Sequence, residues 1–142
     1  MAFGTAVRSS VASLIWTAVA WANVADNAAS SPITNIEVAL HTADPTSGNQ
    51  TTSESAYTSY ARVAVARTTT GYTDTAGVVT NDAAITFPTC TGGSSTVSHV
   101  SNGTAHTGSG SVIVAGALTA SLAVSNGITP QFAINALTVT VA

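Results

Sequence analysis

Histidines and acidic residues are the side chains of this sequence best suited to bind a metal or move a proton. The chain has three histidines and six acids, and His41 with Asp44 is the only compact pair that resembles metal ligands. His99 and His106 flank an Asn-Gly dipeptide and are in a position to face each other across a hairpin. A surface histidine beside a turn-capping aspartate, or two solvent-facing imidazoles on a sheet, is the more common arrangement. The spacing therefore predicts no metal site and no cofactor.

Nucleophilic catalysis has equally little support in the sequence. A G-x-S-x-G elbow does not occur, and a phosphate-binding G-x-x-x-x-G-K-[ST] loop is impossible because the chain has no lysine. Cys90 is the only cysteine, so no intrachain disulfide can form, and nothing nominates a base that would activate it. We expect Cys90 to be a small buried hydrophobic residue and the protein not to be an enzyme.

Charge is scarce along the whole chain. Only 6% of the 142 residues are charged, against about 25% in typical proteins, and the net charge is −3. Three scattered arginines cannot neutralise many phosphates, which excludes nucleic acid as a partner. A surface with so little charge is poorly protected against self-association, and it is better suited to an assembly than to a free monomer.

Residues 1–31 differ from the rest of the chain in their pattern of apolar and polar residues, and they form the first predicted segment. Apolar residues recur at helical spacing, with serines and a threonine on another face, which predicts a helix from Thr5 to about Ala25. The apolar run of about twelve residues is too short to span a bilayer, so no membrane anchor is expected. A secretory signal peptide is the alternative, because Arg8 precedes the run and a small-x-small triplet ends it.

Residues 32–142 form the second predicted segment, an all-β domain. Side chains alternate with period two between closely spaced turn signals, which is typical of an antiparallel β-sandwich of the jelly-roll or Greek-key kind. Asn126-Gly127 is the strongest hairpin signal, as a type I′ turn. About eight strands are expected, at or near 36–40 (half-buried), 60–69, 78–79, 85–87, 97–99 (closed by Asn102-Gly103), 112–124 (in two or three runs), 132–134 and 137–141.

Several large side chains are candidates for an interface. Tyrosine and arginine are enriched at binding hot spots, which favours Tyr57, Tyr60 and Arg62. The alternative is structural: the tyrosines plug the ends of the sandwich and Arg62 pairs with a loop acid. The apolar band of the N-terminal helix must also be covered by the chain's own sheet, a sister subunit or another protein. The full set of candidate interface residues is Leu14, Ile15, Trp16, Trp21, Tyr57, Tyr60 and Arg62.

Six segments have sequences that can be compared with known families: VALHTADP at 38–45, YARVAV at 60–65, AITFP at 84–88, GALT at 116–119, VSNGITP at 124–130 and ALTVT at 136–140. Together they resemble a widespread group of small structural proteins of tailed phages. Their order and spacing agree with that group over about residues 30–142. The resemblance implies membership of a virion and says nothing about chemistry.

The resemblance implies a capsid decoration, or cement, protein on the outer capsid surface. Such a protein would bind the major capsid protein, and by analogy with decoration proteins in general it would be a homotrimer. A tail, neck or fibre-associated phage protein is one alternative, and a secreted adhesin-like β domain is another. Copy number in the particle separates the first two, while retention of residues 1–22 in the mature protein would count against the third.

Overall fold

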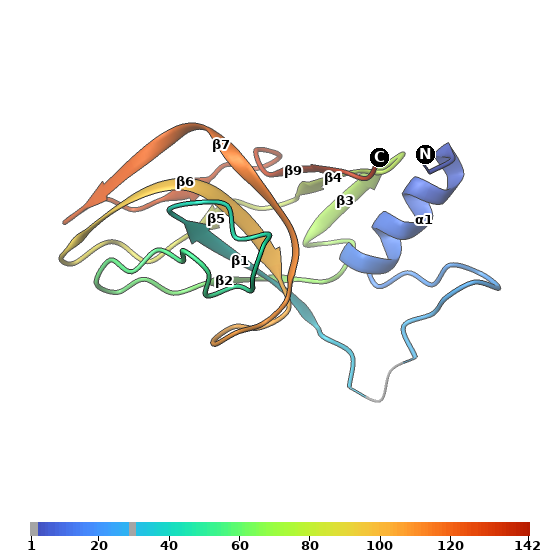
Figure 1. Cartoon of the computed structure of the whole chain (residues 1–142). Helices are drawn as coiled ribbons and strands as arrows, with labels where there is room; N and C mark the ends of the chain where they lie inside the picture. The colour runs from blue at the N-terminus through green and yellow to red at the C-terminus, as the bar shows by residue number, and fades with distance from the viewer. Residues whose placement is uncertain (1–2, 29–30) are drawn as a thin grey trace. The chain divides into compact units, whose positions relative to one another are not determined.

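The computed structural model describes residues 3–28 and 31–142, and this part of the chain contains one helix and nine strands (Figure 1). The strands form sheets of four, three and two strands, and the registers of the first two are antiparallel. The predicted mainly β fold with antiparallel sheets and one N-terminal helix is confirmed. The face-to-face packing of a sandwich stays a prediction.

The chain divides into two compact units. Unit 1 comprises Met1–Asn35, Ala66–Ile85 and Phe132–Ala142, and unit 2 comprises Ile36–Val65 and Thr86–Gln131. Unit 1 thus combines the N-terminal helix with strands from later parts of the chain. The division into 1–31 and 32–142 stays a prediction.

The helix of unit 1, α1 (Thr5–Trp16), ends well before the predicted Ala25. Ala18 has a φ of 55°, in the left-handed region that ends helices. The Ser13 carbonyl accepts the Thr17 N–H at 3.0 Å and the Val19 N–H at 3.2 Å. The predicted length of the helix is wrong. Apolar residues keep their helical spacing beyond Trp16, but the backbone leaves the helix there. No helix of residues 3–28 and 31–142 is long and apolar enough to cross a membrane.

The polar stripe of α1 faces the chain's own sheet in unit 1. That sheet has the order β3-β4-β9, formed by β3 (Tyr72–Thr75), β4 (Val78–Asn81) and β9 (Thr138–Thr140). The hydroxyls of Ser9 and Ser13 donate to the carboxylate of Asp74 on β3. Ala12 and Trp16 of the helix are buried, as is Tyr72 of β3. The helix is therefore docked by hydrogen bonds and by apolar contact.

Unit 2 is built on the four-stranded sheet β2-β1-β6-β7. Its strands are β1 (Asn35–His41), β2 (Val63–Ala66), β6 (Ser94–Gly103) and β7 (Val112–Ser125). The sequence predicts a half-buried strand at 36–40, but β1 is buried on both faces, Glu37 and His41 included. The prediction failed because these polar side chains have hydrogen-bond partners inside the chain.

The long strands β6 and β7 run side by side (Figure 1), and their pairing register has one large irregularity. Val97 pairs with Leu122, whereas His99 pairs with Ala117, so residues 118–121 of β7 lie opposite Ser98 alone. The sequence predicts two or three runs within 112–124, and this break in the pairing divides β7 into two paired parts. Asn102 and Gly103 are the last two residues of β6, so this strand ends where the sequence predicts it to end.

Asn126-Gly127 forms a turn but does not close a hairpin. The Ile128 N–H donates to the Ser125 carbonyl at 2.9 Å, and only the glycine of the dipeptide has a positive φ, of 86°. The next strand, β8 (Gln131–Phe132), pairs with β5 (Ile85–Thr86) rather than with β7. The predicted type I′ hairpin is therefore wrong, because β8 has another partner.

Candidate interaction site

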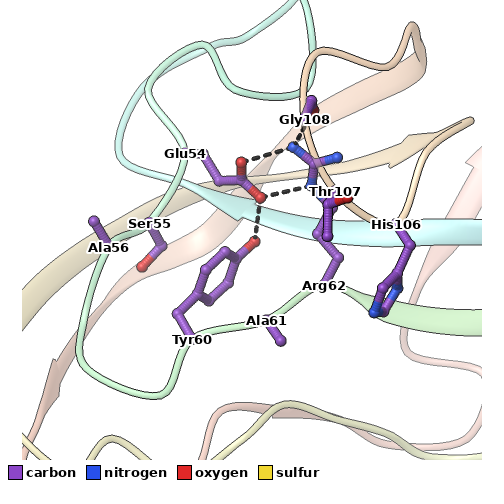
Figure 2. A pocket seen from close by; sticks show the side chains of 9 residues that line it. All are labelled: Glu54, Ser55, Ala56, Tyr60, Ala61, Arg62, His106, Thr107 and Gly108. Atoms are coloured by element: carbon purple, nitrogen blue, oxygen red, sulfur yellow. Dashed lines mark hydrogen bonds and ion pairs between the residues drawn. The ribbon is translucent and has the colours of Figure 1, made fainter.

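Arg62 is the centre of a polar cluster in unit 2. The residue is only 5% exposed, and its guanidinium makes a bidentate pair with Glu54, with Nε to Oε1 and Nη2 to Oε2 both at 2.7 Å (Figure 2). It also donates to the carbonyls of Ala105 at 2.7 Å and Gly108 at 2.8 Å. The Tyr60 hydroxyl donates to Glu54 at 3.0 Å. Arg62 thus pairs with a loop acid, the structural alternative from the sequence.

The protonation states of this cluster suit a structural role. The hydrogen bonds that Arg62 donates to the Glu54 carboxylate raise the pKa of Arg62, and burial raises the pKa of the Tyr60 hydroxyl. Both groups therefore keep their protons throughout the physiological range. The Tyr60 oxygen also accepts the Leu40 N–H at 3.0 Å, so its hydrogen-bonding capacity is occupied within the chain.

The same cluster holds the loop 104–111 between β6 and β7. His106 Nδ1 lies 2.9 Å from a carboxylate oxygen of Glu37, and Gln50 accepts the Ala105 N–H at 2.8 Å. Beside the loop is an open hollow of about 360 Å³ (Figure 2). It is lined by Glu54, Ser55, Ala56, Tyr60, Ala61, Arg62, His106, Thr107 and Gly108. In its wall, the polar side chains of Tyr60, Arg62 and His106 already have hydrogen-bond partners within the chain. The cluster therefore fixes the position of the loop 104–111.

His41 and Asp44 do not converge on a common point. The His41 ring is buried, with Nδ1 2.9 Å from the Thr52 carbonyl and Nε2 2.8 Å from Ser101 Oγ. Burial lowers the pKa of His41, so the neutral ring is favoured. Asp44 instead accepts the Thr46 N–H at 2.9 Å and caps its turn, as predicted. The surface position expected for His41 is wrong.

The other two histidines also lie apart from each other. His99 sits on β6 opposite His41, and His106 pairs with Glu37 from the loop. Their predicted meeting across a hairpin is wrong because His99 is paired with Ala117 of β7, while His106 lies in the loop 104–111 that follows β6. Within residues 3–28 and 31–142, no three His, Cys, Asp or Glu side chains lie close enough to share a metal ion. Cys90 is buried as predicted.

Comparison with known proteins decides the broad class. A family model described as podophage GP4 fiber I protein gp80 matches residues 14–140, which include all nine strands. The chain belongs to this family. It is therefore a structural protein of a phage and a component of the virion. No curated protein matches the chain.

The candidate interface residues of this fibre-family chain differ in how much surface they present. Trp16, Tyr57 and Arg62 are buried, and the Tyr57 hydroxyl donates to the Pro88 carbonyl at 2.9 Å. Leu14, Ile15, Trp21 and Tyr60 are partly exposed. The three buried residues contribute to the fold of the single chain. A role of the set in an interface stays a prediction.

A surface that the sequence did not single out lies on β7. Residues 119–123 are exposed in succession. The signal available in the sequence was the absence of any Asp, Glu, Lys or Arg after Asp82.

Proposed function

We propose that this chain is a non-enzymatic structural component of a phage fibre. The match to a fibre-protein family over residues 14–140 carries the proposal. It supports a tail- or fibre-associated position better than the cement role on the capsid, and it gives no support to a secreted adhesin-like domain. The cement role, and with it the major capsid protein as partner, is the outcome that the tests must separate from the fibre role.

The arrangement of polar groups supports a function without catalysis. Arg62, Glu54 and Tyr60 are engaged with one another and with backbone groups, and His41 is buried against Ser101. A fibre component acts through its shape, its stability and its contacts. The Arg62 cluster contributes to stability, because it fixes the loop 104–111.

Copy number in purified particles tests the proposal. Quantitative mass spectrometry should compare peptides of this chain with peptides of the major capsid protein and of the portal. A fibre component is expected at a small multiple of the portal copy number. A copy number that approaches that of the major capsid protein would favour a decoration protein and would overturn the fibre proposal.

A further inference from the structure

The outer edge of β7 has unused hydrogen-bonding capacity. In the sheet order β2-β1-β6-β7, β7 is the last strand, and no strand of the described chain pairs with its other side. Antiparallel strands direct alternate backbone groups to opposite neighbours, so an edge of 14 residues presents a row of free donors and acceptors. Residues 118–121 also lack one-to-one partners on β6.

The side chains of this strand are uncovered as well. Successive residues of a strand point to opposite faces, so the consecutive exposure of residues 119–123 means that both faces are open there. Leu122 is 38% exposed, although the neighbouring Val124 is buried. Two open faces and an open edge meet in one short stretch of apolar and small residues.

The composition of β7 indicates what kind of partner fits. Exposed edges are usually protected from pairing by lysine, proline, inward-pointing charge or a bulge. β7 has no charged residue and no proline, and its large irregularity is confined to residues 118–121. Residues 83–142 as a whole carry no Asp, Glu, Lys or Arg. A charged partner would find no counter-charge on this strand. A second copy would bring an equally uncharged strand, so no like charges would repel and no ion would lose its hydration.

We propose that two copies of this chain join edge to edge, β7 against β7, in the antiparallel direction. Such a contact is two-fold symmetric and uses the same surface on both copies. The two four-stranded sheets would then continue into one sheet of eight strands. The proposal concerns the isolated chain, so it stands or falls independently of where the protein sits in the particle.

Lysines placed on the edge test the proposal in the full-length chain. The variant carries Ala120→Lys and Leu122→Lys, which put positive charges from both copies beside each other. The matched control is Val78→Lys, because Val78 is 37% exposed on β4, the central strand of its sheet. Light scattering should give twice the 14.0 kDa chain mass for the wild type and for the control, and a single chain mass for the double variant.

Hydrogen exchange on the wild type needs no variant and addresses the same edge. Amides of residues 118–123 are expected to exchange more slowly at high protein concentration than after dilution, while β4 amides do not change. A wild-type monomer at high concentration, a mass of three chains, assembly unaffected by the lysines, or concentration-independent exchange at 118–123 would each overturn the proposal.

Discussion

Buried polar side chains carry the most specific interactions in this protein. Arg62 contacts Glu54 from one loop and two carbonyls from another, so a single guanidinium joins segments far apart in the sequence. Residue type predicted such a pair, because a buried arginine requires partners. The sequence could not predict that Ala105 and Gly108 supply the remaining acceptors, since their carbonyls carry no signature.

Removing Arg62 alone should therefore be costly. Arg62→Met leaves the Glu54 carboxylate largely buried without its counter-ion, and we expect the free energy of unfolding to fall by about 3–5 kcal/mol. Adding Glu54→Gln removes the orphaned charge and should restore part of the loss. Urea unfolding of both single variants and the double variant measures the coupling. Strictly additive losses would contradict the ion pair's role.

His41 should make stability depend on pH. Burial lowers its pKa from the usual 6.5, so the unfolded chain binds this proton more tightly than the folded chain. The contribution of neutral His41 to the free energy of unfolding is complete above about pH 6.5. It is lost as the pH falls from there through the lowered pKa of His41 in the folded state.

Unfolding experiments at about pH 8 and about pH 5 check this dependence. His41→Gln should flatten the difference between the two, whereas the control His99→Gln should retain it. An unchanged pH dependence in His41→Gln would show that another group is responsible. The burial of His41 was not predictable from sequence, because its partner Ser101 is 60 residues away in the chain.

Strand packing decides the outcome of two similar glycine substitutions in the β6–β7 hairpin. A Cβ on Gly103 would lie 2.1 Å from Cδ of Gln50, a side chain that is fully buried. A Cβ on Gly116 would meet nothing within 4 Å. We expect Gly103→Ala to destabilise the fold by about 1–3 kcal/mol. Gly116→Ala should be neutral or stabilise it by up to about 1 kcal/mol. Equal melting temperatures for the two variants would contradict this packing.

Elements were predictable where local pattern determines them. The spacing of apolar residues predicted α1 and most of the strands. The end of α1 at Trp16 was not predictable, because Arg67, far along the chain, donates to the carbonyls of Leu14 and Ile15 in its last turn. The Asn126-Gly127 hairpin failed for a related reason, since the partner of β8 depends on the whole fold.

The whole molecule combines few charged residues with buried polar side chains that mostly have hydrogen-bond partners within the chain. The low charge predicted a protein adapted to assembly, and the family match places the chain among phage structural proteins. Composition could not separate a capsid position from a fibre position, because a stable β fold with few charged residues suits both. The central claim is therefore one of location.

Electron cryomicroscopy of two particle preparations tests that location most directly. One preparation carries the wild-type chain, and the other comes from a phage whose gene for this chain is deleted and not complemented. We predict that density is lost from the fibres, while the capsid lattice and the heat resistance of filled heads do not change. Loss of density across the outer capsid surface, with weakened heads and intact fibres, would contradict the account.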